Sequence, residues 1–98
     1  MNTESTNLSG VVNIDFTIDV AHGVVVDHME VVKPAPDYIT HLCKREYRNI
    51  VSGLIQTRKL GTGSHSYDIR IDVDMMGSSM KMSAWPHGED EPVWKTQE

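Results

Sequence analysis

The chain has 98 residues, 39% of them hydrophobic and 23% charged, and a formal net charge of -5. This length allows one domain with one thin core, and the apolar content is too high for a disordered chain. The lone cysteine excludes an internal disulfide, and no spacing of cysteine and histidine fits a structural zinc site. Without a signal-like N-terminus or a run of ~20 apolar residues, we expect a cytoplasmic protein with no membrane association.

The first predicted element is a strand from Val12 to Val20. Apolar residues there alternate with asparagine, aspartate and threonine, a period of two that is typical of a strand with one face on the core. Residues 1–9 have few apolar groups and no periodicity, so we expect them to form a disordered N-terminal tail.

A two-residue turn at His22-Gly23 is expected to join this strand to a second one. Glycine readily takes the positive φ that tight hairpin turns need, and the turn would pair Val20 with Val25. Prolines at positions 34 and 36 then end the second strand, since proline cannot donate to a sheet ladder.

One amphipathic helix is predicted from the N-cap Asp37 to Leu60, with Gly61 as a left-handed C-cap. Its apolar residues recur at three- and four-residue spacing. They are Ile39, Leu42, Cys43, Tyr47, Ile50, Val51, Leu54 and Ile55. A thiol on such a face usually serves packing, so Cys43 is assigned to the core.

A second hairpin is expected after the helix. Alternation from Tyr67 to Met75 predicts a third strand, and a turn over residues 76–79 leads into a fourth. This turn would place Asp74 opposite Lys81, which is a favourable cross-strand pair.

The order strand, strand, helix, strand, strand predicts an α+β domain over residues 10–88. Its four-stranded, mainly antiparallel sheet (ββαββ) would be covered on one face by the single amphipathic helix. One version makes the first and last strands parallel neighbours, as in β-grasp domains, and that comparison rests on element order alone. Residues 89–98 are expected to form an acidic C-terminal tail.

Two groups of residues are candidates for binding a partner. On the predicted outer sheet face, apolar side chains would gather as they often do at interfaces. They are Val24, Val26, Val32 and Trp85. The segment from Lys33 to Leu60 carries six basic and two acidic residues in an otherwise acidic chain, and its helix has a basic stripe. The stripe consists of His41, Lys44, Arg45 and Arg48.

Candidate catalytic and metal-binding groups are fewer. His28 shares a predicted face with Asp15 and Glu30, where it could titrate or bind a metal, although mixed polar strand faces are common. The glycine-rich segment at Gly61 follows a helix and opens a strand, the reverse of a phosphate loop. We therefore expect no cofactor, no metal and no catalytic residues, and an enzyme is the weaker class.

The favoured function is a small acidic cytosolic protein that binds a protein partner stoichiometrically. Inhibitors, immunity factors and adaptors act in this way, including those encoded by phages and mobile elements, and a homodimer through the outer face or a sheet edge is compatible. One alternative is a ligand- or nucleotide-binding enzyme with a pocket between protomers. Nucleic-acid binding through the basic stripe is the second alternative, although a pI near 5.4 argues against it.

Overall fold

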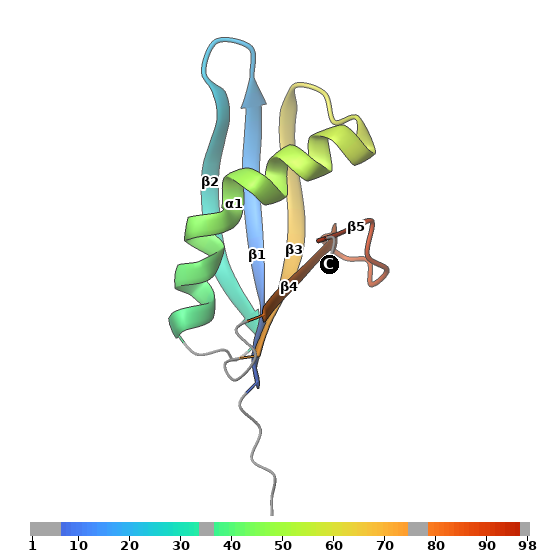
Figure 1. Cartoon of the computed structure of the whole chain (residues 1–98). Helices are drawn as coiled ribbons and strands as arrows, with labels where there is room; N and C mark the ends of the chain where they lie inside the picture. The colour runs from blue at the N-terminus through green and yellow to red at the C-terminus, as the bar shows by residue number, and fades with distance from the viewer. Residues whose placement is uncertain (1–6, 34–36, 75–78, 97–98) are drawn as a thin grey trace, which may run out of the picture.

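The computed structural model describes residues 7–33, 37–74 and 79–96, which form one antiparallel sheet and one helix. The elements are β1 (Asn7–Asp19), β2 (Gly23–Lys33), α1 (Asp37–Arg58), β3 (Gly63–Asp74), β4 (Ser79–Pro86) and β5 (Trp94–Lys95). α1 crosses one face of the sheet obliquely, so that the fold has two layers (Figure 1). The predicted α+β architecture with one helix on an antiparallel sheet is confirmed.

The sheet has five strands rather than the predicted four. β5 comes from residues 89–98, the segment assigned above to an acidic tail. The backbone N–H of Val93 donates to the carbonyl of Ala84 (2.8 Å), and that of Thr96 donates to the carbonyl of Met82 (2.9 Å). The segment therefore pairs along β4, although a strand of two residues is too short to show a period in the sequence.

The strand order is β2-β1-β3-β4-β5, and β1 pairs antiparallel with both β2 and β3. The β-grasp version is therefore wrong, because it requires the first and fourth strands to be parallel neighbours. β3 has twelve residues against eight in β4, and it buries more apolar side chains. The longer and more apolar strand takes the more central place beside β1.

The turn between β1 and β2 differs from the predicted His22-Gly23 turn. It spans residues 20–22, and Asp19 pairs with Gly23 across it. The carboxylate of Asp19 accepts hydrogen bonds from the backbone N–H groups of Ala21 (2.6 Å) and His22 (3.3 Å), which lower the pKa of Asp19. Gly23 has a φ of +75°. Hydrogen bonds from the turn backbone to the Asp19 side chain thus favour the three-residue turn over the predicted two-residue turn.

The changed turn moves two valines to the opposite face of the hairpin. Ile18 opposes Val24 and Phe16 opposes Val26, so both valines pack against the core beneath α1. Their predicted position on the outer face is wrong, because the register next to the turn differs from the predicted one by three residues, and an odd shift exchanges the faces of a strand. Val20, predicted to pair with Val25, lies in the turn and is 90% exposed.

The β3–β4 hairpin keeps its predicted faces in a different register. Asp72, rather than Asp74, opposes Lys81. A shift of two residues leaves the faces of both strands unchanged, and Met82 and Ala84 are buried on the inner face. Residues 76–78 of the predicted turn lie outside the described residues.

The core lies between α1 and the inner face of the sheet. The buried residues of the helix are Ile39, Leu42, Cys43, Ile50, Val51 and Leu54. Tyr47 and Ile55, predicted for the same face, are only partly buried. Burial raises the pKa of Cys43 to about 11, so its thiol stays neutral at physiological pH, as expected for a packing residue.

The C-terminus of α1 is closed by Lys59 rather than by the predicted Gly61. Lys59 takes the left-handed conformation with a φ of 54°, and the N–H of Leu60 donates to the carbonyl of Ile55 (3.3 Å). This is the long hydrogen bond of a Schellman motif. No helix in the described part of the chain is long and apolar enough to cross a membrane.

Candidate functional site

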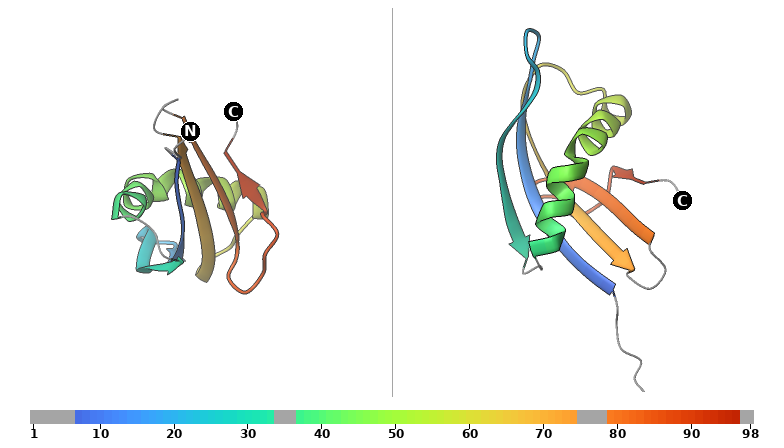
Figure 2. Two further views of the ribbon diagram at one scale, coloured as in Figure 1. Left: turned by 90° about the horizontal axis from the view of Figure 1, so that it is seen from below. Right: turned by 60° about the vertical axis from the view of Figure 1, so that its left-hand side comes forward.

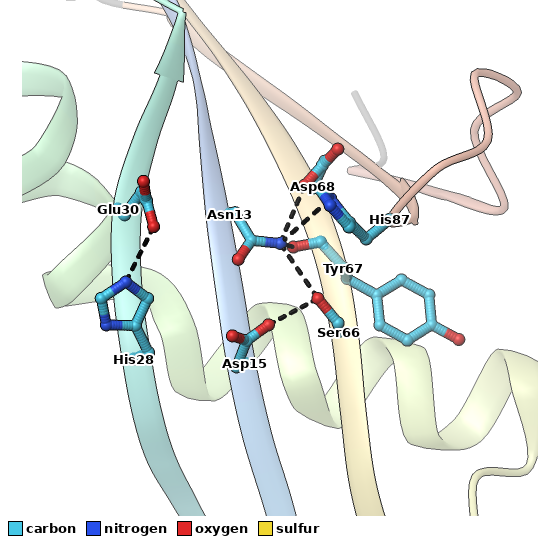
Figure 3. A network of polar contacts seen from close by, with 8 residues as sticks. All are labelled: Asn13, Asp15, His28, Glu30, Ser66, Tyr67, Asp68 and His87. Atoms are coloured by element: carbon cyan, nitrogen blue, oxygen red, sulfur yellow. Dashed lines mark hydrogen bonds and ion pairs between the residues drawn. The ribbon is translucent and has the colours of Figure 1, made fainter.

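The outer face of the sheet, opposite α1, carries a polar network that joins β1 to β3 (Figure 3). We call the set Asn13, Asp15, Ser66, Asp68 and His87 the outer network. Asn13 and Asp68 oppose each other in register and are only 8% and 7% exposed. The amide of Asn13 donates to Asp68 Oδ1 (2.9 Å) and Ser66 Oγ (3.1 Å), and Ser66 Oγ donates to Asp15 Oδ1 (2.5 Å).

His87 connects the turn after β4 to this network. Its Nδ1 lies 3.0 Å from Asp68 Oδ1, and its backbone N–H donates to the carbonyl of Ser66 (3.1 Å). The hydrogen bond and the charge of Asp68 raise the pKa of His87, and the more distant carboxylates of Asp15 and Glu30 raise it further. The buried carboxylate of Asp68 thus has two side-chain partners, as a charge in the interior requires.

The raised pKa of His87 makes a contribution to stability that depends on pH. A group whose pKa is higher in the folded state stabilises the fold below its unfolded pKa, here near 6.5, and this contribution is lost as pH rises through the folded pKa. We expect the difference in thermal midpoint between wild type and His87→Gln to be largest near pH 5 and to shrink by about pH 8.5. Thermal unfolding followed by circular dichroism across this range measures it.

The partner of His87 provides the control for that experiment. In an Asp68→Asn background the main cause of the raised pKa is absent, so the effect of His87→Gln should vary much less with pH. The same pH dependence with and without the Asp68 carboxylate would contradict the assignment of the ion pair.

The outer network contains serine, histidine and aspartate but lacks the arrangement of a nucleophilic site. In a Ser-His-Asp site the hydroxyl donates to the histidine ring and the ring donates to the aspartate. The hydroxyl of Ser66 donates to the carboxylate of Asp15, and within the described residues no hydrogen bond joins it to the ring of His87. In this geometry the network fastens β1, β3 and the turn after β4 to one another.

The predicted group of His28, Asp15 and Glu30 is only partly assembled. His28 Nε2 lies 2.8 Å from Glu30 Oε1 on β2, and Asp15 opposes His28 across the hairpin. The carboxylate of Asp15, however, accepts the hydroxyl of Ser66. Across residues 7–33, 37–74 and 79–96, no three histidine, cysteine or acidic side chains are placed to hold a metal ion.

A groove between α1 and the β1–β2 hairpin is the second candidate site. We call it the hairpin groove; its volume is about 530 Å³. The turn of the hairpin projects beyond α1, so that the helix leaves this end of the inner sheet face open (Figure 1 and the right view of Figure 2). The main lining residues are His22, Val24, Arg48, Val51, Ile55 and Gln56.

The hairpin groove has an apolar floor and a polar rim. Val51 is buried, and Val24 and Ile55 are half-buried beside it, continuous with the core. The exposed side chains of Arg48 and Gln56 lie above them on α1. The floor therefore offers an apolar contact, and the rim offers charge and hydrogen bonds close to it.

Arg48 is the charged group of this rim. Its Nε donates to the hydroxyl of the neighbouring Tyr47 (3.4 Å). No carboxylate of the described residues forms an ion pair with it, whereas Arg45 is paired with Glu46 (3.1 Å). The guanidinium of Arg48 is thus available to a carboxylate from outside the chain.

The eight predicted partner-binding residues do not form one surface. Val24 and Arg48 come together in the hairpin groove, while Val26 packs against the core. Val32 is 44% exposed near the other end of β2, and Trp85 lies on the outer face opposite Asp68 of β3. The remaining three, which are exposed along α1, are His41, Lys44 and Arg45.

The sequence interpretation missed residues of both sites. The signal for the groove was present, because Tyr47, Val51 and Ile55 recur at four-residue spacing and widen the apolar face of α1 beyond what the core can cover. Asn13 and Asp68 gave no such signal, since buried and solvated polar residues look the same in an alternating strand.

Comparisons of the chain with protein-family models, with curated proteins and with solved structures gave no match. The function must therefore be inferred from the hairpin groove and the outer network themselves.

Proposed function

We propose that this protein is a stoichiometric binding module that holds a segment of a protein partner in the hairpin groove. The observation that carries the proposal is the combination of an apolar floor with Arg48 on its rim, which forms no ion pair with a carboxylate of the described residues. Arginine beside a desolvated apolar contact is a frequent source of binding energy at protein interfaces. A segment with an apolar side chain and a nearby carboxylate complements both features.

The proposal covers proteins of the inhibitor, immunity and adaptor types, including those encoded by phages. It places the protein in the cytosol, because a chain with a single cysteine makes no internal disulfide. The enzyme with a pocket between protomers stays an untested alternative.

Nucleic-acid binding through the basic stripe is supported less well than the groove. The side chains of His41 and Lys44 are exposed on α1, but Arg45 is held by Glu46, which lowers the net charge of the stripe. Phosphate binding depends on the number of such free cations.

The experiment that tests the proposal is affinity capture from a lysate of the source cells, with and without nuclease, with wild type, Arg48→Glu and Lys44→Glu compared. Both substitutions reverse one exposed charge of α1 and neither touches the core. We expect one protein to be retained in stoichiometric amount by wild type and by Lys44→Glu, and about tenfold less by Arg48→Glu, since a charge-assisted hydrogen bond becomes a repulsion.

Equal retention by the two variants would contradict binding at the groove. Retention of nucleic acid alone before nuclease treatment, lost with both variants, would move the function to the basic stripe.

A further inference from the structure

β2 is an edge strand, and its segment next to the hairpin turn pairs with β1 without a bulge. In the described part of the chain β2 pairs with β1 alone. Gly23 to Val26 oppose Asp19 to Phe16 without interruption. The free backbone groups of such an edge can pair with a strand from another chain.

Two irregularities limit where this edge can accept a strand. The register of β1 and β2 shifts between Asp15 and Phe16 and again between Val11 and Val12, so that β2 carries Asp27 and Val32 as extra residues. Bulges of this kind twist an edge away from further pairing. The regular segment from Gly23 to Val26 is therefore the best place for an added strand.

The hairpin groove lies next to this regular segment, between its inner face and α1. An added strand would point alternate side chains to the same face as Val24 and Val26, which is the face that looks toward α1. The helix presents Val51, Ile55 and Arg48 there. The groove therefore provides the pockets for alternate side chains that give strand addition its specificity.

The added strand at β2 could come from a different protein or from a second copy of this chain. The charge that each would bring to Arg48 distinguishes the two. On its inner face, β2 itself offers only apolar side chains, among them Val24, Val26 and Met29. A second β2 would bring no carboxylate on that face to Arg48. A partner segment that carries a carboxylate complements the guanidinium better than a second copy does.

We infer that the partner segment binds as a β-strand that adds to Gly23–Val26 of β2, with an apolar side chain on the groove floor and an acidic one at Arg48. This inference rests on the proposed function and adds the conformation and the chemistry of the bound segment. In the complex the sheet has the order partner-β2-β1-β3-β4-β5.

Selection from a displayed library of random peptides of about twelve residues, longer than most strands, tests the inference without a known partner. Wild type serves as bait, and binders retained by Arg48→Glu are removed. We expect the enriched peptides to alternate apolar and polar residues, with an aspartate or glutamate at an inward position. N-methylation of the amides on one edge of a selected peptide should weaken binding about tenfold or more, and methylation of the opposite edge much less.

The possible failures are distinguishable. Enriched peptides with apolar spacing of three and four that still require Arg48 would overturn the strand inference and keep the groove as the site. Alternating peptides insensitive to N-methylation on either edge would also overturn it. No enrichment, or enriched peptides that bind a folded Val24→Lys variant as well as they bind wild type, would overturn the proposed function as well.

Discussion

Replacing Ile50 by alanine is expected to lower the free energy of unfolding by about 2–5 kcal/mol. Ile50 is fully buried at the middle of α1, where it packs in the cluster that holds the helix on the sheet. Truncation removes apolar contacts and leaves a cavity that the surrounding side chains fill only in part. Domains of this size have total stabilities of about 5–15 kcal/mol, so urea unfolding followed by circular dichroism should show a clear loss.

Lys44 provides the matched control on the same helix. Its side chain is exposed, and exposed substitutions away from special features usually change stability by less than about 0.5 kcal/mol. If Ile50→Ala and Lys44→Ala had equal effects, the assignment of the buried face of α1 would be wrong.

Replacing Gly53 by alanine is expected to destabilise the protein by about 1–3 kcal/mol, as overpacking does. Glycine within a helix is ordinarily less favourable than alanine by roughly 0.5–1 kcal/mol. Helix propensity alone therefore predicts that Gly53→Ala stabilises the protein. A Cβ at Gly53 would clash with Nε1 of Trp94 and lie 2.7 Å from its Cε2. The indole therefore has to move away from α1, and the backbone pairing of β5 with β4 resists that movement.

A double-variant cycle isolates this contact. In a Trp94→Ala background the clash is gone, so Gly53→Ala should stabilise the helix by roughly 0.5–1 kcal/mol, the ordinary propensity gain. Ser52→Ala, at an exposed neighbouring position, controls for propensity in wild type. Denaturant midpoints of the four combinations are sufficient, and destabilisation by Gly53→Ala in both backgrounds would rule out the packing of Trp94 as the cause.

The sequence predicted the helix and the inner faces of β1, β3 and β4 because burial imposes a period on them. Ile39, Leu42 and Leu54 are buried, as their spacing predicted. The alternation in β3 likewise predicted which of its side chains face the core. Such patterns sum many small apolar contributions over a whole element, and they persist when one turn is misjudged.

Details that depend on single side chains were not predictable in the same way. The β1–β2 register depends on the carboxylate of Asp19, which closes the turn and thereby changes the faces of Val24 and Val26. The position of β5 depends on Trp94 and Gly53, which are far apart in the sequence and in contact in the fold. Neither interaction leaves a periodic pattern.

The candidate sites show the same division. The charge of Arg48 was visible in the basic stripe, but its place in a groove with Val24 required the correct hairpin register. The outer network depends on cross-strand neighbours such as Asn13 and Asp68, which only the order of β1 and β3 brings together.

Hydrogen exchange of the free protein and of its complex with the captured partner tests most directly whether the hairpin groove is the binding site. We predict slower exchange in the complex at amides of Gly23–Val26, where β2 pairs with no described strand other than β1 in the free chain. Exchange around Trp85 and the outer network should stay unchanged. Protection of the outer face or of the basic stripe, with the hairpin unaffected, would contradict the groove as the binding site.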